Sequence, residues 1–340
     1  MKVTLKDVAA AAGVSRSAVS RAFTPGASVS AATKARVMEA AKALGYTPSA
    51  LASSLTTGKT KLIGLLIDDF AMVDLPEMLE TISAALQAAG LHPILINIAG
   101  ATEPGDAARL LQSYSVDGAI LISRRLPAEF AAALRTPSRP VVHACAGQLA
   151  EGPVHTAGIE EEAVGRIAAR TLLSLGYRRL TLVTGPEDNE TTHDRAAGFL
   201  KVCRNRDIPV NVRQTTGLSV EDGQSAMAKD LADGPGEAVF CTDDTLALGA
   251  LAAIEDAGLE VPDDIGLLGL SSAAIAANPR LSLSTIGIPM AKIAAETVDI
   301  LTAALEDPAL EPQRRRVRCK VVHRASLAGS DTRPETDEAA

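Results

Sequence analysis

The chain has 340 residues, of which 47% are hydrophobic and 22% are charged, and it is too long for one ordinary domain. It contains no run of about eighteen apolar residues, and its first ten residues lack the apolar core of a signal peptide, so the sequence predicts neither a membrane span nor export. Four cysteines without a C-x-x-C spacing are typical of free thiols in a reducing compartment, and we expect the protein to be cytoplasmic.

Charge is distributed unevenly along the chain. Residues 1–60 contain eight Lys or Arg and two Asp or Glu, whereas residues 61–340 contain 25 basic and 39 acidic side chains. A basic segment joined to an acidic body is expected when one module binds phosphate and the other repels it. A solvated basic face would give the same pattern, and charge alone leaves both interpretations open.

Residues 1–45 predict three short helices in the arrangement of a helix-turn-helix headpiece. Thr4 and Asp7 have the spacing of a capping box at the start of the first helix. Ser15 and Ser30 are N-cap residues for the second and third helices, and Gly45 is expected to end the third.

The apolar positions of these helices recur at helical spacing, which indicates a small common core. Val19 and Ala22 are expected to point inward from the second helix. Val37, Ala41 and Leu44 are expected to share the buried face of the third.

Residues 46–60 form a connector of low apolar content. Pro48 can start a short helix over residues 49–55, and Gly58 can end it. One or two turns are below the length at which a helix is stable alone, so this hinge helix is expected to form when it is bound.

Residues 61–327 alternate between short apolar runs and amphipathic segments, which predicts parallel sheets with crossover helices. Two such series predict two doubly wound lobes, the first over about 61–159 plus 288–316 and the second over about 160–287 plus 317–327. A helix around 291–305 and a strand around 317–322 complete them. Residues 328–340 are acidic and poor in apolar side chains, which predicts a disordered tail. The predicted strands are 63–67, 94–98, 119–122 and 141–143 in the first series, and 180–183, 238–241 and 265–270 in the second.

Residues 4–21, TLKDVAAAAGVSRSAVSR, resemble the N-terminal signature of the LacI/GalR family of transcriptional regulators (lactose-repressor type). Weaker matches follow in the family's order along almost the whole chain. The resemblance implies a helix-turn-helix headpiece on an α/β body whose two lobes are of the periplasmic-binding-protein type. It also implies a homodimer that binds double-stranded operator DNA and a small-molecule effector. The further matches are Y-x-P at 46–48, VDG at 116–118, LGYRR at 175–179, D-D-x-x-A-x-G at 243–249 and VHRAS at 322–326.

The residues themselves fit such a role, because a recognition helix must present short and basic side chains to the major groove. Arg16, Ser17 and Arg21 are expected on the exposed face of the second helix. By resemblance, Arg16 and Ser17 read bases, and Lys34 and Ser30 contact phosphates. The full set of expected DNA contacts is Thr4, Ser15, Arg16, Ser17, Ser20, Arg21, Ser30, Lys34, Ala52 and Leu55.

Leu55 stands near the end of the polar connector. The family uses a leucine there as a wedge that paired hinge helices insert into the minor groove. The alternative is a satellite contact with the body. Ser49 and Ser53 depart from the Asn and Arg that are usual in the family, and serine at position 53 should remove a phosphate contact.

Ligands of open α/β sheets bind beyond the carboxyl ends of the strands, which here means between the lobes. Arg195 matches the arginine that grips the effector in the family; the alternative is a helix-surface arginine paired with Asp194 or Glu190. Residues 71–75 read AMVDL where the family has an aromatic floor, and Leu270-Ser271 replaces an aromatic residue followed by Asp. The expected effector-binding residues are Asp69, Asp74, Arg195, Leu218, Asp243 and Ser271.

A chain with no Trp and 2% aromatic residues offers little stacking surface for a sugar ring. A sugar is the leading expectation for the effector, followed by a carboxylated or other small polar metabolite, and then by loss of the effector response. No nucleophile or acid–base constellation and no metal-ligand spacing occurs, so we expect no catalytic residue, metal or cofactor. A periplasmic-type binding protein without DNA function is the rival class; it would have a signal peptide and no headpiece.

Overall fold

The computed structural model describes residues 3–23, 27–46, 58–70, 72, 74–100, 103–145, 153–271 and 274–328. The chain divides into two compact units, Met1–Lys61 and Leu62–Ala340. The predicted hinge helix at 49–55 and the predicted tail from residue 329 onward lie outside the described residues. No helix in the described part of the chain is both long and apolar enough to cross a membrane.

The first unit is a headpiece of three helices, α1 (Leu5–Ala12), α2 (Arg16–Phe23) and α3 (Ala31–Leu44). Its helices begin where the sequence predicts. The Thr4 amide donates to Asp7 Oδ2 at 2.8 Å, and the hydroxyl oxygens of Ser15 and Ser30 each accept a backbone N–H of the following turn at 3.2 Å.

The headpiece core consists of one apolar face from each helix. Val8, Val19 and Val37 are fully buried at its centre. Leu44 is 38% exposed, so the prediction that it joins this core was wrong. It lies on the same helical face as Val37 but in the last turn of α3, beyond the packed positions.

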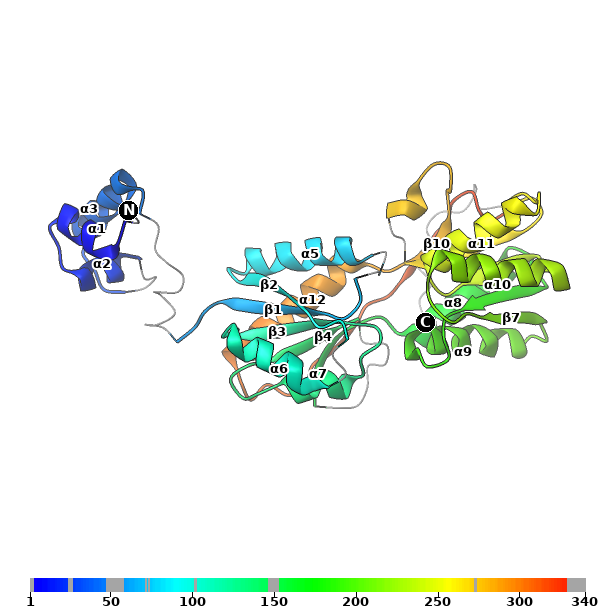
Figure 1. The fold of residues 1–340 in the computed structure, drawn as a ribbon, viewed down its shortest axis with the longest axis horizontal. Helices are drawn as coiled ribbons and strands as arrows, with labels where there is room; N and C mark the ends of the chain where they lie inside the picture. Colours follow the sequence, from blue (N-terminus) through cyan, green and yellow to red (C-terminus); the bar gives the residue numbers. More distant parts are fainter. Residues whose placement is uncertain are drawn as a thin grey trace. The chain divides into compact units, whose positions relative to one another are not determined.

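The first lobe of the second unit is a six-stranded parallel sheet in the order β11-β5-β4-β3-β1-β2. Helices α5 (Leu75–Ala88) and α12 (Met290–Glu306) cover one face, and α6 (Pro104–Ser113) and α7 (Ala128–Leu134) cover the other (Figure 1). The strands are β1 (Leu62–Ile67), β2 (His92–Asn97), β3 (Gly118–Ile122), β4 (Val141–Ala144), β5 (His155–Gly158) and β11 (Arg314–Arg316).

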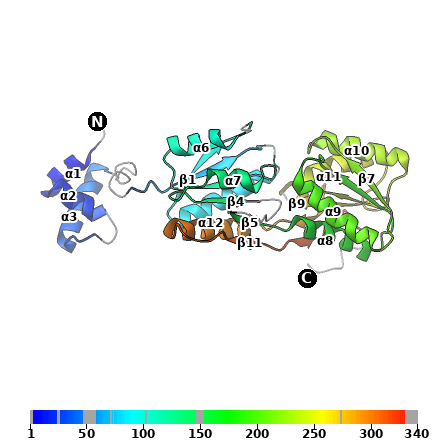
Figure 2. The ribbon, with the colours of Figure 1, turned by 90° about the horizontal axis from the view of Figure 1, so that it is seen from below.

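The second lobe has the same plan, with the strand order β12-β10-β9-β8-β6-β7. Helices α8 (Glu161–Ser174) and α9 (Glu190–Arg204) pack together on one face, and α10 (Val220–Asp233) and α11 (Asp244–Asp256) pack together on the other (Figure 2). A short 3-10 helix, Ala274–Ala277, follows β9. The strands are β6 (Leu180–Thr184), β7 (Val210–Gln214), β8 (Ala238–Cys241), β9 (Gly266–Ser271), β10 (Ser284–Gly287) and β12 (Lys320–Val322).

The sequence predicts one strand at 317–322, and the bounds of that prediction were wrong. The chain instead forms two three-residue strands, β11 in the first sheet and β12 in the second, and β12 runs antiparallel to β10. The intervening residues pass from one lobe to the other. The short strands β5, β7 and β10 were not predicted, because sequences such as HTAG and STIG carry little apolar signal.

Helices α8 and α9 approach each other so closely that only glycine fits at the contact. A Cβ atom at Gly165 would overlap the carbonyl oxygen of Arg195, and one at Gly198 would overlap the carbonyl oxygen of Glu162. Both obstacles are backbone atoms, which cannot move aside as a flexible side chain could. The contact therefore fixes the distance between these two helices.

We predict that Gly198→Ala lowers the free energy of unfolding by about 1–3 kcal/mol or more, because the methyl group forces the helices apart. Gly105→Ala is the matched control, since a Cβ there meets only Arg109 Nη1 at 4.0 Å. This control should be neutral or slightly stabilising. Urea unfolding of both variants measures the difference; equal stabilities would contradict the tight contact.

Candidate DNA-binding surface and interlobe cleft

Helix α2 has one buried and one exposed face. Val19 and Ala22 are buried, as predicted, whereas Arg16, Ser17 and Arg21 are exposed. Arg21 Nε donates to the Ser17 carbonyl at 3.4 Å. The two cations and the hydroxyl thus lie on the exposed side of a helix whose other side packs in the core.

The remaining predicted DNA contacts lie around this helix or outside the described residues. Thr4 and Lys34 are exposed, Ser30 is an exposed N-cap, and Ser20 is half-buried. The Ser15 and Ser17 hydroxyls lie 2.9 Å apart at the start of α2. Ala52 and Leu55 fall in the undescribed segment 47–57.

A cleft of about 530 Å³ lies between the lobes of the second unit. Asp69, Arg124 and Asp243 each stand two residues beyond the end of a strand, β1, β3 and β8 respectively, so the cleft occupies the carboxyl edges of both sheets. Its volume is in the range of small-molecule sites. The lining residues are Asp69, Met72, Arg124 and Arg125 from the first lobe, and Asn189, Gly217, Leu218, Ser219, Val220, Asp222, Asp243 and Thr245 from the second.

The predicted effector-binding residues fall into three groups. Asp69, Leu218 and Asp243 line the cleft. Asp74 and Ser271 lie beside it and bond to each other, with Ser271 Oγ donating to Asp74 Oδ2 at 2.9 Å. Arg195 does not line it.

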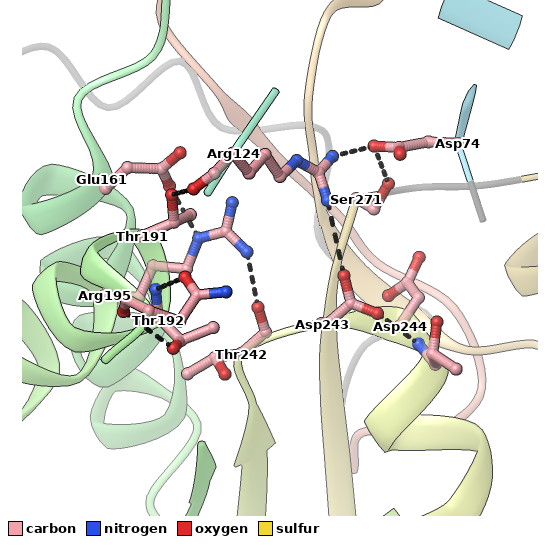
Figure 3. A network of polar contacts seen from close by, with 12 residues as sticks. Asp74, Arg124, Glu161, Thr191, Thr192, Arg195, Thr242, Asp243, Asp244 and Ser271 are labelled. Atoms are coloured by element: carbon pink, nitrogen blue, oxygen red, sulfur yellow. Dashed lines mark hydrogen bonds and ion pairs between the residues drawn. The ribbon is translucent and has the colours of Figure 1, made fainter. Parts of the chain in front are cut away.

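Arg124 joins the two lobes through its guanidinium (Figure 3). Nη2 forms an ion pair and hydrogen bond with Asp74 Oδ2 of its own lobe, and Nη1 lies 3.6 Å from Asp243 Oδ2 of the other lobe. The backbone is tied as well, because the Thr191 hydroxyl of α9 donates to the Arg124 carbonyl at 3.0 Å. The side chain of Arg124 is 11% exposed and that of Asp74 is 2% exposed, so solvent screens this contact little.

Opposing effects act on the pKa of Asp74. Burial raises it, but the Arg124 charge and the hydrogen bonds from Ser271 and Arg124 outweigh burial and hold the pKa below its ordinary value of 3.8. For Arg124 the signs are reversed: burial lowers its pKa, but the neighbouring carboxylates of Asp74 and Asp243 outweigh burial and raise the pKa above its ordinary value. Both groups are charged at neutral pH.

The backbone of Ser271 is strained at the same contact. Its φ is 139°, in a region that residues with a side chain rarely adopt. The hydroxyl that this conformation presents is the one that bonds Asp74 across the lobes. The strain thus coincides with the interlobe bond.

Arg195 is buried inside the second lobe, so the alternative of a helix-surface arginine paired with Asp194 or Glu190 was wrong. Its side chain is 1% exposed, Nε donates to Glu161 Oε2 at 2.6 Å, and Nη1 donates to the Thr242 carbonyl at 2.7 Å. Nη2 is buried without a hydrogen-bond partner among the described residues. The arginine therefore connects α9 to α8 and to the end of β8, directly before Asp243.

The residues that the sequence analysis missed are Arg124 and Arg125. Arg125 is 56% exposed, and its Nε lies 3.2 Å from the buried Asp68 carboxylate. Both arginines follow β3 at the edge where the cleft was expected, and this position was the available signal. No group of three or more His, Cys, Asp or Glu in the described residues has metal-binding geometry.

We predict that Arg124→Gln lowers the free energy of unfolding at pH 7 by about 3 kcal/mol, because it leaves the Asp74 carboxylate buried without its cation. Arg109→Gln is the control: its pair with Asp106 is 76% and 57% exposed, so the loss should stay below about 1 kcal/mol.

The effect of Arg124→Gln should depend on pH. A lowered folded-state pKa stabilises the protein above about pH 4, near the ordinary Asp pKa of 3.8, and this contribution is lost as pH falls through the folded-state value. The difference between wild type and variant should therefore shrink over the range from about pH 5 down through the folded-state pKa of Asp74, which lies below 3.8. Urea unfolding across that range measures it; a constant difference would show that Asp74 is not the group concerned.

Both the headpiece and the two-lobed body resemble known proteins. Residues 4–49 match the family model "Bacterial regulatory proteins, lacI family", and residues 169–327 match the "Periplasmic binding protein-like domain" model. The chain is 32% identical over 332 residues to the HTH-type transcriptional repressor PurR of Edwardsiella ictaluri, covering 96% of this chain and 97% of that protein.

Solved structures share the fold over nearly the same length. The structure of the lac repressor dimer bound to operator and the anti-inducer ONPF has a TM-score of 0.84 and 25% identity, covering 96% of this chain and all of that one. A LacI-family transcriptional regulator from Silicibacter pomeroyi has a TM-score of 0.75 and 26% identity, covering 96% of this chain and 99% of that chain.

Proposed function

Because the chain belongs to the lacI family of bacterial regulatory proteins, we propose that it is a transcriptional repressor that binds operator DNA as a homodimer under the control of a small ligand. The main structural evidence for DNA binding is the exposed face of α2, which presents Arg16, Ser17 and Arg21. A helix anchored by Val19 and Ala22 can enter the major groove with that face leading.

Two rival classes are set aside. The PurR relatives are transcriptional repressors and not enzymes, so no catalytic role is assigned to the chain. A periplasmic-type binding protein would account for the body but not for the match of residues 4–49 to the regulatory family. A repressor acts where the DNA is, and we place the protein in the cytoplasm.

The proposed DNA contacts are of two kinds: those that recognise bases and those that position the headpiece on the DNA backbone. Arg16 and Ser17 read base edges and Arg21 adds a further contact, while Thr4, Ser15, Ser20, Ser30 and Lys34 position the headpiece on the backbone. Ala52 and Leu55 are assigned to the minor groove on the family resemblance alone, with Leu55 as the wedge.

The cleft is the ligand site. Asp69, Leu218 and Asp243 line it and are assigned direct contacts. Asp74 and Ser271 act through Arg124, and Arg195 positions the strand end that carries Asp243. A ligand changes DNA affinity only if it binds one arrangement of the lobes better than the other, and the Arg124–Asp243 pair across the lobes is sensitive to that arrangement.

We predict that Arg16→Ala weakens binding to the operator by about 1–3 kcal/mol and has little effect on random DNA, because it removes a base contact. Lys34→Ala should weaken both by similar amounts and reduce the dependence of log K on log salt by about one unit. Titrations of both variants on both DNAs test the assignment. Identical behaviour of the two variants would mean that α2 is not the recognition helix.

We predict that the full chain selects a sequence with two-fold symmetry from a random DNA pool, since one headpiece buries too little surface for tight specific binding. Light scattering of the complex with the selected DNA should give two protomers per duplex. A single protomer on an asymmetric site would contradict the dimer.

A further inference from the structure

The charges around the cleft are unbalanced. Three carboxylates, those of Asp69, Asp222 and Asp243, line it together with the guanidiniums of Arg124 and Arg125. Both arginines already form ion pairs with carboxylates, Arg124 with Asp74 and Asp243, and Arg125 with Asp68. These described residues comprise five carboxylates and two guanidiniums, and the pair of Arg195 with Glu161 behind them adds one charge of each sign.

Two carboxylate oxygens in the wall behind the cleft lack a hydrogen-bond donor within the described part of the chain. Asp68 and Asp74 are 5% and 3% exposed, and Oδ1 of each is buried without a hydrogen-bond partner among the described residues. A buried carboxylate oxygen without a donor is costly.

Asp243 presents an acceptor to the cleft. Its Oδ1 accepts the Thr245 amide at 2.8 Å, while Oδ2 is only loosely paired with Arg124 Nη1 at 3.6 Å, beyond hydrogen-bond distance. No hydrogen bond to Oδ2 is present in the part of the chain that the structure describes. A ligand donor can therefore approach Oδ2 more closely than Arg124 does.

The remaining lining residues restrict the chemistry of the rest of the ligand. Met72, Leu218 and Val220 supply aliphatic surface, and Asn189 and Ser219 supply an amide and a hydroxyl; no aromatic side chain is among the described lining residues. A cation is therefore recognised here by carboxylates and not by stacking on a ring. A compact, partly polar carbon skeleton with one ammonium group fits this surface.

We propose that the effector of the interlobe cleft is a small primary amine whose ammonium group binds Asp243. This inference rests on the proposed function in that it assigns a chemical class to the ligand of the same cleft. Arg124 is the resident cation of the site, and the ligand supplies a second one at the loosely held carboxylate. An acid of the same size is repelled by the Asp243 carboxylate, and a neutral analogue lacks the charge-assisted bond.

The test is a thermal-shift screen of the full chain followed by calorimetry on matched sets of compounds. Glucosamine, glucose and glucuronate form one set, and 5-aminopentanol, 1,5-pentanediol and 5-hydroxypentanoate form another. Screening extends to further amines, each with its hydroxyl and carboxylate counterpart. We expect the tightest binder to be an amine, with affinity at least tenfold above that of its counterparts and falling as pH rises through the pKa of the amine.

Variants locate the site. Asp243→Asn should weaken the binding of the best amine at least tenfold and reduce its preference over the neutral counterpart. Glu255→Gln removes one negative charge farther along α11, where Glu255 is exposed, and should leave the affinity unchanged. Equal effects of the two variants would show attraction by the net charge of the body alone and would overturn the assignment of Asp243.

The proposal is overturned if the tightest binder is neutral or acidic, or if no amine binds. The proposed function is tested separately by binding of the ligand-free and ligand-bound chain to the selected operator. Repression in response to a neutral ligand would overturn only this inference. Binding of an amine without binding of DNA would overturn only the proposed function.

Discussion

Arg124 carries one positive charge into the contact between the two lobes, where carboxylates from both sheets face it. Its two contacts differ in strength: the pair with Asp74 is a buried hydrogen-bonded one within the first lobe, and the pair with Asp243 is loose, at 3.6 Å. Separation of the lobes would break the pair with Asp243 and the hydrogen bonds from Ser271 to Asp74 and from Thr191 to the Arg124 carbonyl, but not the pair of Arg124 with Asp74, which lies within one lobe. The opening of the cleft is therefore compatible with keeping the Asp74 charge compensated, which burial otherwise makes costly.

The second buried arginine has a different role from the first. Arg195 binds Glu161 and the Thr242 carbonyl within one lobe, at the crossing where Gly165 and Gly198 bring α8 and α9 into backbone contact. This arrangement ties α8, α9 and the end of β8 together directly before Asp243.

The helix caps were predictable because Thr4, Ser15 and Ser30 form hydrogen bonds within their own helical turns. The buried strands were predictable because apolar runs such as LIGLLI are stable only in the protein interior. Partners distant in sequence were not predictable in the same way. Arg195 lies 34 residues from Glu161, and Arg124 lies 50 residues from Asp74. The family resemblance placed Arg195 at the ligand, but nothing in the sequence indicated that Glu161 would bury it, and Arg124 had no counterpart in the motif. Leu44 was misassigned because periodicity marks a face and not where packing ends.

The placement of β11 has a consequence for synthesis on the ribosome. The first sheet begins at Leu62 but acquires its edge strand only at Arg314–Arg316, after strands β6 to β10 of the second sheet have been made, and the second sheet acquires its own edge strand only at Lys320–Val322. The headpiece, by contrast, has all its core residues once Tyr46 has emerged. A nascent chain therefore holds a finished DNA-binding module while its regulatory body is still an incomplete pair of sheets with open edges, and such edges are where chaperones and neighbouring nascent chains attach.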